Sequence, residues 1–191
     1  MKIGIDISQI VYTGTGVARY VSRITEACVK QAPYHEFILF GASFRQKNIL
    51  RSYMQTMQKQ YKNVRTVLLS FPTTFMDILW NRLHIVPIQQ FIGPVDMFWS
   101  SDWIQPPIGK AIGVTTIHDV SFFHFPESFD KKIITVQKRR LYWATKECSL
   151  FLCDSKATKH DVIQKLHLRE DSCVVIYPGY TSLEKLNSIL S

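Results

Sequence analysis

The sequence has no stretch with the features of a transmembrane helix or of a secretory signal peptide. Its longest apolar run, residues 85–99, is broken by Pro87, Pro94 and Asp96 and is too short to span a bilayer. We expect no leader peptide, because Lys2-Ile3-Gly4-Ile5-Asp6-Ile7, near the start of the sequence, has the composition of a strand. We therefore expect a soluble, cytoplasmic protein, with any membrane contact peripheral and at the inner face.

The sequence also lacks the common motifs of metal sites, P-loop nucleotide hydrolases and serine hydrolases. The four cysteines (Cys28, Cys148, Cys153 and Cys173) form no C-x-x-C pair and have no histidine at metal-ligand spacing. They are expected to be reduced packing residues, and no metal site or metal cofactor is expected. Neither G-x-x-x-x-G-K-[ST] nor G-x-S-x-G occurs, so P-loop nucleotide hydrolysis and serine-hydrolase chemistry have no support.

Acidic residues are absent between Phe37 and Met76, and the chain carries a formal net charge of +8. A second basic cluster occupies residues 131–146 and includes Tyr142 and Trp143. Such a field favours anionic partners, either nucleotide diphosphates or an anionic membrane surface, although a solvated basic surface explains it equally well. No aromatic–basic pattern of a nucleic-acid site is present, so no nucleic-acid partner is expected.

Strands and helices alternate along the chain, which at 46% apolar residues is long enough for one substantial core. Strands are predicted at residues 2–7, 36–41, 64–69, 95–100, 113–118, 150–153 and 174–177. Helices are predicted at residues 17–30, 44–62, 75–90 (interrupted at Pro87), 129–146 and 156–166, the last capped by Asp154 or Ser155. This pattern predicts an α/β fold: a doubly wound, mostly parallel, Rossmann-like sheet of about seven strands with helices on both faces.

His118 and Asp119 follow the apolar strand predicted at residues 113–118. Ligands of open α/β sheets bind beyond the carboxyl ends of the strands, so this pair lies where chemistry is expected. The pair could orient a substrate hydroxyl or transfer a proton. Equally, His118 could be satisfied by a backbone carbonyl while Asp119 caps the next turn.

The loop Thr13-Gly14-Thr15-Gly16-Val17-Ala18 resembles a dinucleotide fingerprint, but it starts well beyond the first strand, and no acid follows the second strand to hold a ribose. A nicotinamide-dependent dehydrogenase is therefore disfavoured. The glycines and the start of the following helix could still approach a phosphate or sugar oxygen, or they could simply form a turn.

Three segments in order resemble group 1 (family 4) glycosyltransferases. They are Thr13-Gly14-Thr15-Gly16-Val17-Ala18-Arg19-Tyr20, Thr116-Ile117-His118-Asp119-Val120-Ser121 with Phe125-Pro126-Glu127, and residues 153–161 followed by Tyr177-Pro178-Gly179. The resemblance implies the GT-B architecture, in which two Rossmann-like domains face each other across a cleft. Residues 1–180 would be the N-terminal, acceptor-side domain, and residues 181–191 would begin the linker to an absent donor-binding domain.

The resemblance also implies roles for particular residues. His118, with Asp119 beside it, would be catalytic, and Gly14, Thr15, Gly16 and Arg19 would bind substrate. The complete enzyme would transfer a hexose from a nucleotide-sugar, with retention, to a glycan or lipid-linked acceptor, as in polysaccharide biosynthesis. No cofactor is implied beyond the donor itself.

Two further expectations follow. The isolated domain should be nearly inactive, and its exposed interdomain surface could support a dimer. The alternative is a non-catalytic binding or regulatory module for anionic ligands or a membrane surface.

Overall fold

The computed structural model describes residues 1–179. Its strands are β1 (Lys2–Asp6), β2 (Glu36–Ala42), β3 (Val64–Leu69), β4 (Met97–Ser100), β5 (Ile112–Ile117), β6 (Cys148–Cys153) and β7 (Cys173–Val175). Its longer helices are α1 (Gly16–Gln31), α2 (Lys47–Gln60), α5 (Lys131–Glu147) and α6 (Lys156–Leu166). Shorter ones are α3 (Thr73–Met76), a π-helix (Asp77–Arg82), α4 (Gln89–Ile92) and 3-10 turns at Ser8–Val11, Ser121–Phe123, Pro126–Ser128 and Glu170–Ser172.

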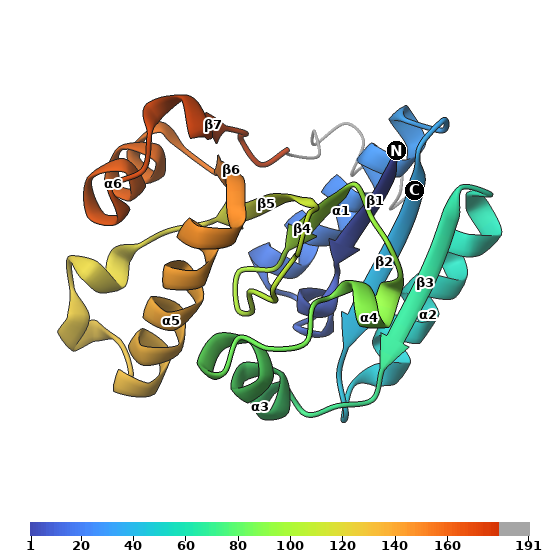
Figure 1. The fold of residues 1–191 in the computed structure, drawn as a ribbon, viewed down its shortest axis with the longest axis horizontal. Helices are drawn as coiled ribbons and strands as arrows, with labels where there is room; N and C mark the ends of the chain where they lie inside the picture. The colour runs from blue at the N-terminus through green and yellow to red at the C-terminus, as the bar shows by residue number, and fades with distance from the viewer. Residues whose placement is uncertain (180–191) are drawn as a thin grey trace, which may run out of the picture.

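All seven strands form one sheet in the order β3-β2-β1-β4-β5-β6-β7, and every pair is parallel (Figure 1). The predicted doubly wound, Rossmann-like sheet is confirmed. The strand order reverses between β1 and β4, because the chain first builds outward to β3 and then returns to the other side of β1. In such sheets the crevice at the reversal is the usual place for a ligand.

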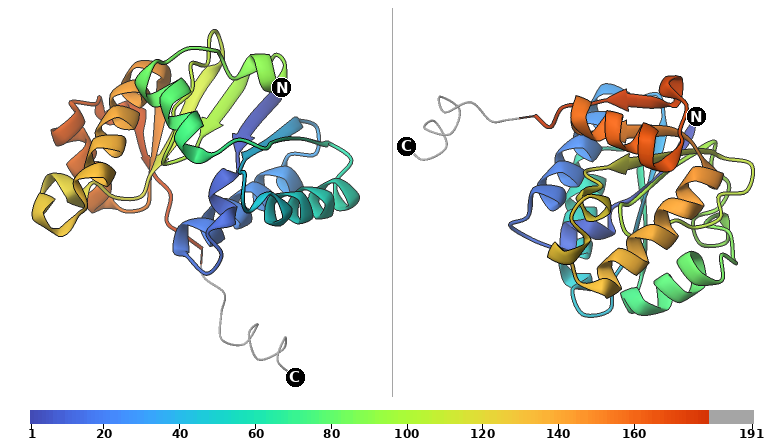
Figure 2. Two further views of the ribbon diagram at one scale, coloured as in Figure 1. Left: turned by 90° about the horizontal axis from the view of Figure 1, so that it is seen from below. Right: turned by 90° about the vertical axis from the view of Figure 1, so that its left-hand side faces the viewer.

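Helices cover both faces, and the alternation of side chains along β2 shows how. Phe37 and Leu39 point into a core formed with α1 and α2, whereas Ile38 and Phe40 point into a second core with Trp80 and its neighbours. Figure 2 shows α1 and α2 on one side of the sheet and α3 and α5 on the other. A third core joins β5 and β6 to α5 and α6.

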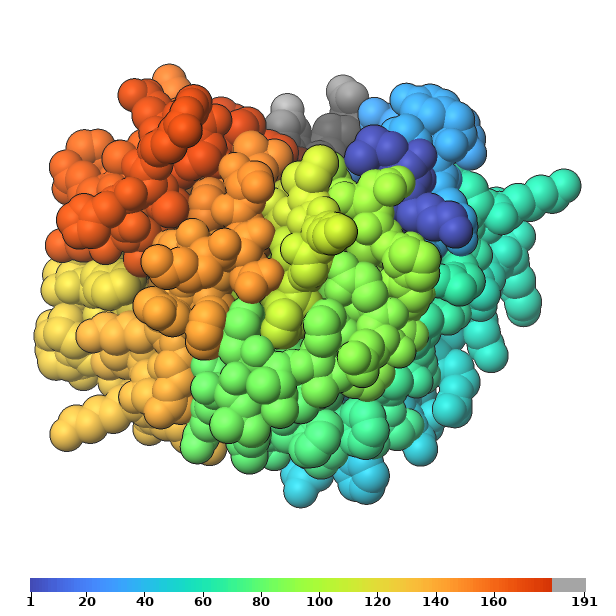
Figure 3. Space-filling model, in the orientation of Figure 1, coloured from blue at the N-terminus to red at the C-terminus, as the bar shows by residue number. Residues whose placement is uncertain are grey.

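The helix predicted at residues 75–90 is interrupted around Pro87, as expected, but the break begins earlier than predicted. Helical structure ends at Arg82, the backbone takes positive φ at His84 (50°) and Val86 (62°), and α4 begins only at Gln89. Pro87 has no amide hydrogen to continue a helix, and the Trp80 indole instead donates to the Val86 carbonyl at 2.9 Å. The segment lies beside α5 (Figure 3), where the Trp143 indole donates to the Asn81 carbonyl at 2.9 Å.

The remaining predicted elements are close to those observed. β5 ends at Ile117, so His118 is the first residue beyond the strand rather than its last. The loop expected at residues 8–15 begins with a 3-10 turn. All four cysteines are free thiols, and burial raises the pKa of Cys148 and Cys153 to about 12. The linker predicted at residues 181–191 lies outside the described residues.

Candidate functional site

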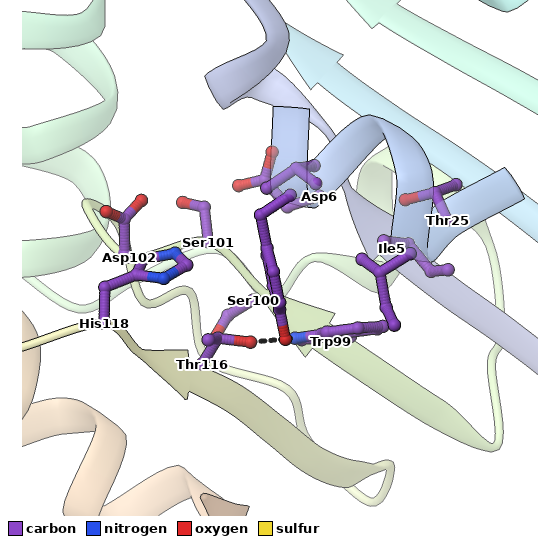
Figure 4. Close-up of a pocket in the computed structure, with 12 residues that line it drawn as sticks. Ile5, Asp6, Thr25, Trp99, Ser100, Ser101, Asp102, Thr116 and His118 are labelled. Carbon is purple, nitrogen blue, oxygen red and sulfur yellow. Dashed lines mark hydrogen bonds between the residues drawn. The ribbon is translucent and has the colours of Figure 1, made fainter. Parts of the chain in front are cut away.

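The carboxyl ends of β1, β4 and β5 lie side by side in the sheet, so the residues that follow them share one edge. Asp6 ends β1, Ser101 and Asp102 follow β4, and His118 follows β5. Figure 4 shows Ser101, Asp102 and His118 close together, with Asp6 behind them. His118 was predicted to lie at the carboxyl end of its strand, and it does; the strand-order reversal, between β1 and β4, is one strand away.

His118 is held by contacts from three elements. Its Nδ1 lies 2.6 Å from Asp154 Oδ2, at the end of β6. The Tyr20 ring of α1 packs edge-on against the imidazole, with centroids 5.1 Å apart. The His118 carbonyl accepts a hydrogen bond from Thr158 Oγ1, on the first turn of α6, at 3.2 Å. The imidazole ring of His118 therefore has a defined orientation at the carboxyl end of the sheet.

Asp119 lies beside His118 in sequence but has a different environment. Its side chain is exposed, and its Oδ1 accepts from the Ser121 amide at 2.9 Å, which stabilises the turn after β5. This contact matches the alternative from the sequence, in which Asp119 caps the turn that follows it. Asp119 does not line the small cavity beside His118, and its catalytic role stays a prediction.

The glycine loop forms the start of α1. Gly14 has φ of +86°, which favours glycine. Apart from adjoining backbone, no atom of the described residues lies within 4 Å of where a Cβ would stand on Gly14 or Gly16. Thr15 is the N-cap: its Oγ1 accepts from the Ala18 amide at 3.2 Å and donates to the Tyr12 carbonyl at 2.8 Å. Arg19 is exposed on the first turn. The structure thus leaves the backbone at both glycines open to close approach, while the Thr15 hydroxyl is engaged in capping.

Two carboxyl groups near His118, those of Asp6 and Asp102, are largely shielded from water. Burial raises the pKa of Asp6, whose Oδ1 accepts from the Ser8 amide at 2.9 Å. Burial likewise raises the pKa of Asp102, although nearby His118 and Arg140 act to lower it. Asp102 Oδ1 is buried without a hydrogen-bond partner among the described residues.

Arg140 of α5 braces the loop after β4 and the end of β5. It is 1% exposed and donates to the Ser101 carbonyl at 2.9 Å, to the Thr116 carbonyl at 3.0 Å and to Thr115 Oγ1. Burial lowers the pKa of its guanidinium group, and the Asp102 carboxylate partly opposes that shift. Arg140 therefore fixes the position of the segment that carries Ser101 and Asp102.

Two cavities flank this edge. The smaller, of about 20 Å³, lies under α1 and contacts Asp6, Asp102 and His118. Three buried hydroxyls without described partners, those of Tyr20, Thr25 and Ser101, also line it, so it suits about one water molecule.

The larger cavity, of about 290 Å³, opens beyond β1, β2 and β4. Tyr12, Ile78 and Trp103 give it apolar walls, and Lys132 of α5 supplies a cation. Arg82 also lines it but is paired with Asp77 at 3.1 Å. This cavity has room for part of a small organic ligand.

Residues 14–181 match the family model described as Glycosyltransferase Family 4. The chain belongs to this family. Apart from Thr13, the match covers all three segments on which the sequence resemblance rests. A comparison with curated proteins gives no match to the chain.

Several polar residues of this family 4 domain escaped the sequence analysis as site residues: Asp6, Tyr20, Ser101, Asp102, Arg140 and Asp154. Asp154 was considered only as a helix cap. The cap is instead Ser155, whose Oγ accepts from the Thr158 amide at 3.0 Å. The available signal was that Asp154, like His118, directly follows an apolar strand.

Within the described residues, no group of three or more His, Cys, Asp or Glu side chains is arranged to hold a metal ion. The helices of this same part of the chain include none that is long and apolar enough to cross a membrane. The chemistry available at the edge is hydrogen bonding and proton transfer by His118, in a setting of buried carboxyl groups.

Proposed function

We propose that this domain is the acceptor-side half of a retaining glycosyltransferase that moves a hexose from a nucleotide-sugar to an acceptor hydroxyl. The observation that carries the proposal is His118, oriented one strand away from the strand-order reversal of a family 4 domain. The donor-binding domain would follow residue 180 in the complete protein. Gly14, Gly16 and Arg19, at the start of α1, would face the donor diphosphate across the cleft.

In the proposed reaction the bond between the anomeric carbon and the diphosphate oxygen breaks, and the acceptor oxygen bonds to that carbon on the same face. The hydroxyl proton leaves with the diphosphate. His118 would hydrogen-bond the transferred sugar through Nε2, because Nδ1 is occupied by Asp154. Few fixed cations converge on His118, so stabilisation of the leaving diphosphate would fall mainly to the other domain.

The larger cavity would receive the acceptor, and its walls favour one with an apolar portion. Tyr12 and Ile78 line the cavity although they are 45% and 44% exposed, so an apolar ligand would cover surface that water now contacts. Lys132 could pair with an anionic group next to that portion, as in a lipid-linked acceptor. Such an acceptor would also bring the domain into peripheral contact with an anionic membrane.

The decisive experiment is a transfer assay on the complete enzyme that contains this chain. A panel of labelled nucleotide-sugars is offered with pairs of acceptors that share one sugar and differ in whether a lipid is attached. We expect transfer with retained anomeric configuration, read by NMR of the product, and little or no transfer by the 191-residue chain alone.

Ile78→Ser should raise the KM for the lipid-linked acceptor and leave the soluble one unaffected. Leu83→Ser is the matched control, because Leu83 is 57% exposed and does not line the cavity. Equal effects of the two substitutions would count against an apolar acceptor. Failure of the complete enzyme to transfer any sugar, with anionic ligands still bound, would favour the non-catalytic binding module.

A further inference from the structure

The contact between His118 and Asp154 joins two strand ends that are adjacent in the sheet but distant in sequence. Ile117 of β5 pairs with Cys153 of β6, so the next residue on each strand emerges at the same place on the edge. The side chains are 15% and 21% exposed, and their polar atoms are 2.6 Å apart. The pair is therefore largely shielded but opens to the surface on one side.

The chemistry of the pair fixes where the imidazole carries a proton. An ionised carboxylate only accepts hydrogen bonds, so Nδ1 must be the donor in this contact. A free neutral imidazole prefers its proton on Nε2, so Asp154 selects the opposite tautomer. In that tautomer, Nε2 has a free lone pair to accept a hydrogen bond.

The surroundings hold both partners in place. The Ser155 cap and the bond from Thr158 Oγ1 to the His118 carbonyl fix the start of α6 against the end of β5. Tyr20 restrains the imidazole from the α1 side. Asp154 Oδ1 is buried and has no partner among the described residues, so the carboxylate has one oxygen committed to His118.

The neighbouring carboxylates are not equivalent to Asp154. Asp119 Oδ1 is engaged with the Ser121 amide. Asp102 also lies near His118, but no hydrogen bond joins the two. Among the described residues, Asp154 is the carboxylate bonded to the His118 ring.

We propose that Asp154 is a positioning residue that orients His118, holds its proton on Nδ1 and presents Nε2 to substrate as an acceptor. Its catalytic consequence rests on the proposed transferase function, but the proton position does not. Asp154 would act on the reaction only through His118.

The first test is a measurement of the imidazole itself. Two-dimensional ¹H–¹⁵N NMR of the ¹⁵N-labelled 191-residue chain reports which ring nitrogen of neutral His118 carries the proton. We expect Nδ1–H in the wild type and mainly Nε2–H in Asp154→Ala. Asp154→Asn should retain part of the Nδ1–H population, because its amide oxygen still accepts.

The matched control is Asp161→Ala, which removes the carboxylate from another histidine–carboxylate pair, His124–Asp161 at 3.2 Å. It should leave the His118 signal unchanged. Backbone amide spectra of each variant verify that the fold is intact, and Asp154→Asn serves if Asp154→Ala does not fold. An Nε2–H tautomer in the wild type, or the same tautomer in the wild type and every folded Asp154 variant, would overturn the proposal.

The second test is a double-mutant cycle in the complete enzyme. Asp154→Ala should lower kcat about 10- to 100-fold with little change in KM, and should add almost nothing to His118→Ala. The same loss in both backgrounds would assign Asp154 a structural role and refute the positioning role. An inactive wild type would count against the proposed function alone, since the NMR result is independent of turnover.

Discussion

The imidazole of His84 lies flat on the indole of Trp143, with ring centroids 3.7 Å apart and planes 2° from parallel. His84 Nδ1 lies 2.9 Å from the Trp80 carbonyl, and Nε2 lies 2.9 Å from Glu147 Oε1. Both ring nitrogens of His84 therefore have a polar partner within hydrogen-bond distance. The stack joins α5 to the segment after the π-helix and keeps His84 in its positive-φ conformation.

Removing this imidazole should destabilise the fold. His84→Ala loses the stack and leaves the Glu147 carboxylate without one of its partners, at a cost of about 1–3 kcal/mol. His124→Ala is the control, because the side chains of its pair with Asp161 are about one third exposed (35% and 33%) and should contribute less than about 1 kcal/mol. Urea unfolding of both variants measures the difference, and equal losses would contradict the role given to His84.

Two glycines should respond oppositely to alanine. A Cβ on Gly113 would overlap the backbone carbonyl of Glu147 and lie 2.8 Å from Cys148 Cα, so Gly113→Ala should cost about 1–3 kcal/mol or more. Apart from adjoining backbone, Gly16→Ala meets no atom of the described residues within 4 Å, and it places a better helix former at the start of α1. It should leave stability unchanged or raise it by up to about 1 kcal/mol. Thermal unfolding distinguishes the two, and a stable Gly113→Ala would show that β5 and β6 can move apart.

Replacing Asp102 should raise the free energy of unfolding at neutral pH. Burial raises the folded-state pKa of this carboxyl above its ordinary value of 3.8, so folding favours the protonated form. The associated stability is present below pH 3.8 and is lost as pH rises through the folded-state pKa.

Asp102→Asn removes this titration. Its free energy of unfolding should therefore exceed that of the wild type at neutral pH, and the gain should shrink toward acid. Asp96→Asn is the control, since exposed Asp96 accepts from the Lys2 amide at 2.7 Å and gains nothing by losing its charge. Urea titrations across a pH series give the comparison, and a gain that grows toward acid would contradict the sign.

His118→Ala should separate activity from stability. In the complete enzyme, turnover should fall about 10²- to 10⁴-fold, the range for a side chain that assists proton transfer or charge development. The 191-residue chain should stay folded, with a loss of about 1–3 kcal/mol for the partner taken from Asp154, and this loss would not account for the fall in turnover. His160→Ala, exposed on α6, is the control. Unchanged turnover of His118→Ala would remove His118 from the mechanism.

The fold was predictable from the sequence because each strand is a short apolar run and each long helix has one apolar face. His118 could be placed at the sheet edge for the same reason, since it directly follows such a run. The error at residues 75–90 has a local cause. Apolar residues continue at helical spacing past Arg82, and nothing in that spacing reveals that His84 and Val86 have left-handed backbone geometry.

The partners of His118 were not predictable, because they depend on which strands become neighbours. Asp154 is at an ordinary strand-to-helix junction, where an aspartate is a common cap. Its contact with His118 exists only because β5 and β6 are adjacent and in a register that aligns Ile117 with Cys153. Asp102 and Arg140 come together through the same long-range order.

The three cores also follow one another along the chain. The first draws its buried residues from Ile5 to Val64, the second from Ile38 to Ile108 and the third from Ile117 to Cys173. A ribosome would therefore release the chain in the order in which its parts can pack. The first core can close while β1 still has one open edge, and β4 covers that edge when it emerges. His118 and Asp154 can meet only once β6 has been synthesised, so the candidate site depends on the third core, which α6 and β7 complete.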